Sequence, residues 1–122
     1  MKYLCLAYYD LDKFKALTPT DMQALGAQCK THDEALRASG KASAHASLSM
    51  PDQWKTIRPR GGKPMVSDGP FSEAKELVGS FFLIDADSID EAVRIASLHP
   101  AAQVGEALGW GLDVRPCDMF VA

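Results

Sequence analysis

The segment from Val78 to Ala86 constrains the fold of this chain most, because it is apolar on both faces of an extended strand. Such a strand is typical of the centre of a sheet that is covered on both sides. The chain has 122 residues, a length that suits one hydrophobic core. We therefore expect a single domain, residues 1–122, built around this central strand.

The first part of the chain predicts a strand followed by a helix. Lys2 to Tyr9 is a short, aromatic-rich apolar run and fits a buried strand. Thr18 can cap a helix whose first turn tolerates Pro19, and Gly40 is a suitable stop. Between them one apolar stripe recurs at helical spacing, made of Met22, Leu25, Cys29, His32 and Leu36.

From Ala42 to Ser49 the period changes to two, which predicts a strand with one polar face. The small and apolar face consists of Ala42, Ala44, Ala46 and Leu48, and the polar face consists of Ser43, His45, Ser47 and Ser49. Two further strands, Trp54 to Arg60 and Lys63 to Ser67, flank Gly61-Gly62. A glycine pair suits a tight hairpin whose turn residues need positive φ.

The second half supplies the remaining elements. Ser88 to Glu91 reads as a capping box that opens a second helix, which ends before Pro100. Gly105 to Gly111 is expected to be a loop, and Leu112 to Phe120 a last strand. The element order predicts an α+β fold, a ferredoxin-like βαββαβ arrangement with an inserted β-hairpin. Both helices should cover one face of the sheet and leave the other face open.

Composition argues against several classes of partner. A net charge of -3 argues against nucleic acid and against an anionic membrane surface. No apolar run approaches membrane-spanning length, and the opening residues do not resemble a secretory signal, so we expect a cytoplasmic protein. Cys5, Cys29 and Cys117 lie far apart without a CxxC pair, and glycine-rich phosphate loops are absent. We expect no cofactor and no metal.

The open sheet face carries the next expectation. If the alanines of the second strand pack under the helices, His45 points to the open face. The same alternation turns Asp113, Arg115 and Cys117 of the last strand to that face. Charged groups there would line a polar cavity, or Asp113 and Arg115 would simply pair near a sheet edge. The sequence leaves both readings open.

One motif identifies a family. The run Ser67-Asp68-Gly69-Pro70-Phe71-Ser72-Glu73-Ala74-Lys75-Glu76 resembles the signature of the DGPF branch of the YCII-related proteins. The resemblance extends from Met1 to about Phe120. It implies a dimeric α/β barrel, a homodimer in which two copies pair their open sheet faces. It implies no single reaction, and DGPF-type domains also resemble partners of extracytoplasmic-function sigma factors, so a non-catalytic regulatory module is the alternative.

Asp68 is the first candidate catalytic residue. Its carboxylate precedes Gly69 and Pro70, so a rigid turn holds it, although an Asp at this place is also a common structural turn residue. The resemblance adds three charged residues of the motif as ligand-binding candidates, which are otherwise a solvated turn: Glu73, Lys75 and Glu76.

His99 is the second candidate catalytic residue. Better-known YCII-like members have an Asp-Pro pair here, proposed to act with a histidine of the first helix, whereas this chain has His99-Pro100. We expect an inverted pair of Asp68 and His99 in one site, with a raised pKa for His99. Arg115 and His45 are further ligand-binding candidates, because a guanidinium recognises carboxylate or phosphate. The first hypothesis is thus a pocket for a small polar or anionic molecule, with cofactor-independent acid–base chemistry.

Overall fold

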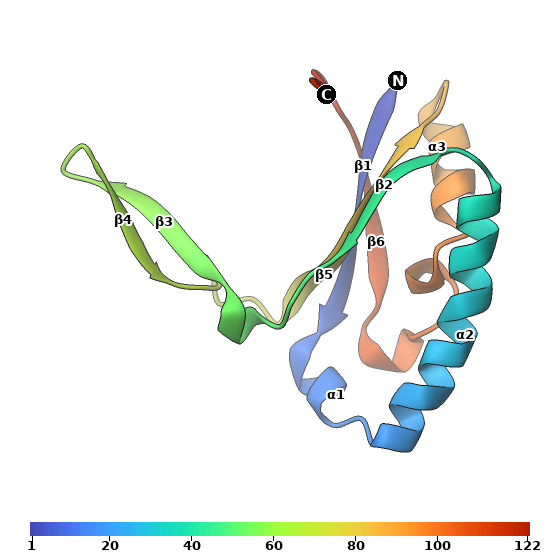
Figure 1. Ribbon diagram of the computed structural model, residues 1–122, viewed down its shortest axis with the longest axis horizontal. Coiled ribbons are helices and arrows are strands. Elements are labelled where there is room, and N and C mark those ends of the chain that lie inside the picture. The colour runs from blue at the N-terminus through green and yellow to red at the C-terminus, as the bar shows by residue number, and fades with distance from the viewer.

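The computed structural model describes residues 1–122 as a four-stranded antiparallel sheet with two helices on one face and a separate hairpin (Figure 1). The strand order is β2-β5-β1-β6. This order and the element sequence are those of a ferredoxin-like α+β fold, so the predicted fold class is confirmed. The sheet strands are β1 (Lys2–Asp10), β2 (Ala42–Ser47), β5 (Glu76–Asp85) and β6 (Gly111–Pro116).

The helices begin and end where the sequence indicates. In α2 (Pro19–Ala38) the Thr18 hydroxyl accepts from the Asp21 N–H, and the Asp21 carboxylate accepts from the Thr18 N–H, both at 3.1 Å. In α3 (Ile89–Ala96) the Ser88 hydroxyl accepts from the Glu91 N–H at 3.1 Å. These caps satisfy backbone donors that a helix start leaves unpaired. No helix of the chain is both long enough and apolar enough to cross a membrane.

Short elements fill the connections. A helix not expected from the sequence, α1 (Leu11–Lys15), follows β1 directly. Strand β6 ends at Pro116, earlier than the expected end at Phe120. Single 3₁₀ turns lie at Pro51–Gln53, Pro100–Ala102 and Glu106–Leu108.

The hydrophobic core lies between one half of the sheet, α3 and the end of α2. Its buried residues are Tyr3, Cys5, Leu36, Phe82, Ile84, Ala86, Ala92, Ile95 and Ala96. Of the apolar stripe of α2 only Leu36 is buried, while Met22 remains 48% exposed. The first half of α2 therefore does not seal the sheet beneath it.

A β-bulge in β2 reverses one sequence prediction. Ala42 pairs with Ile84 and Ala44 with Leu83, so the register shifts at Ser43. The extra residue switches the alternation. Consequently Ala42 packs against the core, and His45, opposite the buried Phe82, points to the helices. The expectation that His45 faces the open side is wrong.

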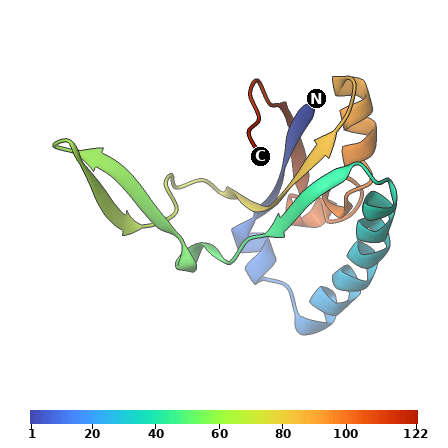
Figure 2. The ribbon, with the colours of Figure 1, turned by 45° about the horizontal axis from the view of Figure 1, so that its top comes forward.

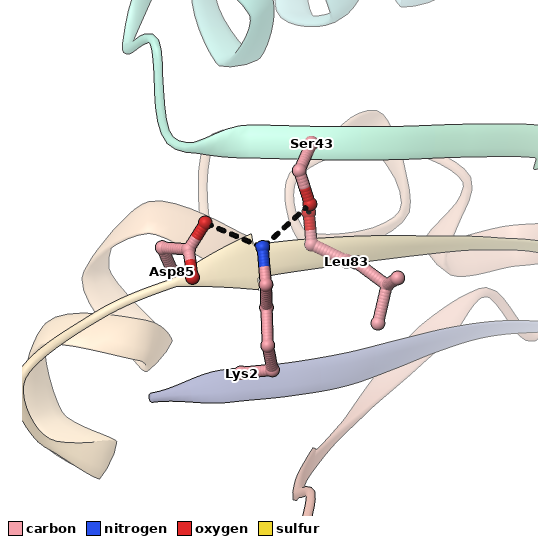
Figure 3. Close-up of polar contacts among 4 residues, drawn as sticks. All are labelled: Lys2, Ser43, Leu83 and Asp85. Atoms are coloured by element: carbon pink, nitrogen blue, oxygen red, sulfur yellow. Dashed lines mark hydrogen bonds and ion pairs between the residues drawn. The ribbon is translucent and has the colours of Figure 1, made fainter. Parts of the chain in front are cut away.

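The bulge is joined to the sheet by side-chain contacts (Figure 3). Lys2 Nζ lies 2.7 Å from Asp85 Oδ2 and donates to Ser43 Oγ at 3.4 Å. The Ser43 hydroxyl in turn donates to the Leu83 carbonyl at 3.5 Å. The bulged residue is thus held by side chain and backbone groups of β1 and β5.

The hairpin predicted around Gly61-Gly62 is confirmed. Its strands are β3 (Lys55–Arg60) and β4 (Lys63–Asp68), and both glycines have positive φ, 59° and 77°. The two strands form a sheet of their own. They project from the body on the side away from α2 and α3 (Figures 1 and 2).

Candidate functional site

A cavity of about 220 Å³ lies on the helix side of the sheet, beyond the end of the hydrophobic core. Its lining is mostly apolar, with aromatic rings from β1, α1 and the loop before β6: Tyr9, Phe14 and Trp110. Polar side-chain atoms come from Ser47, Ser80 and His99, and from the Tyr9 hydroxyl and the Trp110 indole N–H. The first half of α2 leaves this end of the sheet uncovered. The Tyr9 ring packs directly on Gly79, where a Cβ would come within 2.9 Å of it.

His99 is the buried titratable residue of this cavity, with 6% of its surface exposed. Its ring stacks on Phe82, with centroids 4.8 Å apart and planes at 8°. Nδ1 accepts a hydrogen bond from the Ala101 backbone N–H at 3.0 Å. A backbone N–H can only donate, so in the neutral ring the proton is on Nε2.

Nε2 of His99 makes no hydrogen bond within the protein. The only hydrogen bond to a nitrogen of this ring is the one that Nδ1 accepts. No fully buried side-chain nitrogen or oxygen lacks a partner. Nε2 is therefore not sealed in the core, and the cavity that His99 lines is where it can meet another molecule. The ring presents one fixed N–H donor.

The charge state of His99 is opposite to the expected one. Burial lowers its pKa from 6.5 to about 4; Asp33 acts to raise the pKa, and His45 acts to lower it. The expectation of a raised pKa is wrong, because a ring buried against Phe82 loses the hydration that stabilises its charged form. His99 is neutral near pH 7.

Asp33 is the residue that the sequence reasoning missed. It is half-buried on α2 and acts on His99 through its charge without a hydrogen bond. His45 is the other titratable residue that acts on His99, and its ring centroid lies 5.8 Å from that of His99. No sequence signal singled out Asp33, because the partner expected for His99 was Asp68 in the motif turn. His32 is half-buried on the same helix, but of the two residues only Asp33 acts on the pKa of His99.

Asp68 lies outside this site. It ends β4 in the projecting hairpin, its side chain is 88% exposed, and its carboxylate lies 2.5 Å from Lys55 Nζ. The hydrogen bond from Lys55 lowers the pKa of Asp68. Within one chain Asp68 and His99 therefore do not meet, and the inverted pair is not formed. The other candidates of the motif are also exposed: Glu73, Lys75 and Glu76.

Arg115 faces the open side of the sheet, as expected, and so lies across the sheet from His99. Its guanidinium donates to Asp113 Oδ2 at 2.8 Å and to the Tyr8 hydroxyl at 3.1 Å. The Tyr8 hydroxyl donates to the same carboxylate at 3.1 Å. Of the two readings left open by the sequence, the structure shows the compact ion pair. It lowers the pKa of Asp113 through the hydrogen bonds from Arg115 and Tyr8.

The arrangement does not form a metal centre, because no three His, Cys, Asp or Glu side chains converge. The site is a mostly apolar cavity of about 220 Å³, and the neutral His99 ring in its wall provides an N–H donor.

Comparison with known proteins places the chain in a family. Residues 1–108 match the model of the YCII-related domain. The chain belongs to the YCII-related family. This YCII-related chain is 35% identical, over 124 residues, to the uncharacterized protein R00369 of Rhizobium meliloti (strain 1021), a match that covers 98% of this chain and 94% of that protein.

A solved structure is also similar to this YCII-related chain. It is the 5-chloro-2-hydroxyhydroquinone dehydrochlorinase TftG from Burkholderia phenoliruptrix AC1100, in complex with 2,5-dihydroxybenzoquinone. The sequences are 20% identical, the TM-score is 0.44, and the match covers 97% of this chain and 94% of that one.

Proposed function

We propose that the chain binds a small, mostly apolar ring compound through a carbonyl or anionic oxygen, which accepts a hydrogen bond from His99 Nε2. The observation that carries this proposal is the fixed tautomer of His99. Its Nδ1 is occupied by the Ala101 N–H, and its Nε2 is free to meet a ligand.

The size and lining of the cavity support a one-ring ligand. A dry apolar cavity of about 150 Å³ holds one benzene molecule. The volume here, about 220 Å³, leaves room for one ring with small substituents. The hydroxyls of Ser47 and Ser80 add adaptable polar contacts, so an apolar ring with oxygen substituents fits better than a strongly hydrated ion.

The chemistry of His99 suits an oxygen that gains negative charge. A buried neutral imidazole keeps its proton near neutral pH and donates it in a hydrogen bond. Such a preorganised donor polarises a carbonyl and stabilises an oxyanion more strongly in a low-dielectric site than in water. Asp33 and His45 adjust how readily the ring accepts a second proton. Polarisation of a carbonyl, or stabilisation of an oxyanion, on a bound ring compound without a cofactor is the activity we propose.

Two uncharged probes of matched shape test the binding site. Acetophenone carries a carbonyl where α-methylstyrene carries a methylene group. We expect acetophenone to bind about tenfold more tightly, in line with one hydrogen bond in a buried site. In His99→Asn the side-chain oxygen can take the place of Nδ1 and accept from the Ala101 N–H. The amide nitrogen then takes the place of ring carbon Cδ2, so no donor remains at the position of Nε2. The preference should then disappear, as measured by ligand-observed NMR.

A protein that binds neither probe, or a preference that persists unchanged in His99→Asn, contradicts the proposal. Tyr9 and Phe14 resonances should shift with either probe, because both rings line the cavity. Shifts confined to other parts of the chain would place the ligand elsewhere.

A homodimer is the second part of the proposal. The open face presents two directly paired sets of half-buried apolar side chains: Leu4 with Leu83, and Leu6 with Phe81. The helices α2 and α3 lie on the other face of the sheet (Figure 1). A second copy would cover them through an isologous, two-fold interface. Light scattering should give twice 13.2 kDa, and Phe81→Glu should give 13.2 kDa.

The alternative function is a regulatory or interaction module of the kind associated with extracytoplasmic-function sigma factors. The exposed apolar surface supports it as well, since such surfaces bind proteins. It predicts that His99→Asn leaves the biological activity intact while Phe81→Glu abolishes it. In either case we place the protein in the cytoplasm.

A further inference from the structure

The hairpin strands β3 and β4, residues Lys55–Asp68, form a projecting arm with two different faces. Cross-strand partners share a face of a ribbon. The pairs Ile57 with Val66 and Pro59 with Pro64 make one face apolar, and the pairs Arg58 with Met65 and Arg60 with Lys63 make the other face basic.

Nothing in the chain covers the apolar face of the arm. Ile57 is 63% exposed and Val66 is 61% exposed, and in both strands only Thr56, at the base, is buried. A hairpin of two strands is at best marginally stable in water by itself. An apolar face on such a ribbon therefore calls for a partner surface.

The direction of the arm restricts where that partner lies. The arm leaves the body between β2 and β5, and it lies on the side of the sheet opposite α2 and α3 (Figures 1 and 2). This is the side of the open face. A molecule seated on the open face would be within the reach of the arm, whereas one bound to the helices would not.

Charge selects a second copy of the same chain. The arm contains four cations and one acid, Lys55, Arg58, Arg60, Lys63 and Asp68, for a net charge of +3. The whole chain has a net charge of -3, so the remainder carries -6. In a homodimer each arm, with a net charge of +3, would approach a body whose net charge is -6, and the two-fold axis repeats this approach.

We infer that the arm is a dimerisation arm, which packs its apolar face against the body of a second copy while that copy's arm does the same in return. The inference rests on the homodimer proposed above and adds a second contact region to it. In the dimer the side chains of Ile57 and Val66 are buried.

A pair of neighbouring substitutions tests the arm. Val66→Glu places an acid on the apolar face, and Met65→Glu places the same charge one residue away on the basic face. We expect Val66→Glu to weaken dimerisation about tenfold or more, because a buried apolar contact at the interface is lost. Met65→Glu changes the net charge by the same amount without touching the apolar face, so it should weaken dimerisation clearly less than Val66→Glu. Sedimentation equilibrium measures the dissociation constant, and circular dichroism checks that both variants are folded.

The outcomes separate this inference from the homodimer itself. If Phe81→Glu gives monomers while Val66→Glu dimerises like the wild type, the dimer stands and the arm inference fails. If the wild type is monomeric at all concentrations, both fail.

Cross-linking of the unmodified sequence gives a second test that does not depend on a variant folding. A carbodiimide joins lysines to carboxylates that touch them. In dimers mixed from ¹⁴N and ¹⁵N protein, we expect Lys63 to be joined to body carboxylates in pairs of unlike isotope. Links found only within one isotope would overturn the inference.

Discussion

The pKa of the His99 imidazole depends first on burial and then on two neighbouring side chains, which shift it in opposite directions. Asp33 acts to raise the pKa of His99, and His45 acts to lower it. We predict that Asp33→Asn lowers the pKa of His99 further and that His45→Gln raises it, as measured by NMR titration of the ring. Asp68→Asn is the control and should leave the titration unchanged, because Asp68 is exposed and paired with Lys55. An effect of Asp68→Asn as large as that of Asp33→Asn would contradict this account.

The same residue makes stability depend on pH. The pKa of His99 is about 4 in the folded chain against 6.5 for a free histidine. Between these values the unfolded chain binds a proton that the folded chain does not, so stability is complete above about pH 6.5 and falls as the pH decreases toward 4. We predict that lowering the pH from about 7.5 to about 4.5 reduces the free energy of unfolding of the wild type by about 2 to 3 kcal/mol more than it reduces that of His99→Asn. Urea unfolding at each pH measures these free energies. Parallel pH profiles of the two proteins would show that His99 is not the group responsible.

At the scale of the elements, regular patterns could be predicted and local irregularities could not. The caps at Thr18 and Ser88 and the turn at Gly61-Gly62 are local signals, and the structure has them where the sequence indicates. The bulge at Ser43 has no such signal, since it depends on how β2 pairs with β5. One inserted residue turned His45 to the helix side and so brought it to His99.

In the candidate site, too, some residues could be predicted from the sequence and others could not. His99 could be singled out from its place before Pro100, and it does line the cavity. Its partner could not be chosen from sequence, because proximity across elements depends on packing: the motif favoured Asp68, whereas Asp33 of α2 is the carboxylate that acts on the ring. The cavity itself follows from a helix whose apolar stripe is only partly buried, which periodicity alone does not reveal.

At the scale of the whole molecule, charge is separated between arm and body, and this separation has a measurable consequence. Two copies, each with a net charge of -3, repel one another, and salt relieves that repulsion. A basic arm against an acidic body attracts at short range, and salt weakens that attraction. If the arm contacts the partner, the short-range attraction dominates, because charges separated by less than about 10 Å are screened least.

We therefore predict that the dimer dissociates more readily when salt rises from about 0.05 M to about 0.5 M. In the double variant Arg60→Gln, Lys63→Gln the net charge becomes -5 and the arm loses half of its cations. Repulsion then dominates, so the variant should dimerise weakly at low salt and more tightly as salt is added. The sign of the salt dependence should thus differ between the two proteins, as measured by sedimentation equilibrium. The same sign in both would mean that the basic residues of the arm do not lie close enough to the partner to attract it.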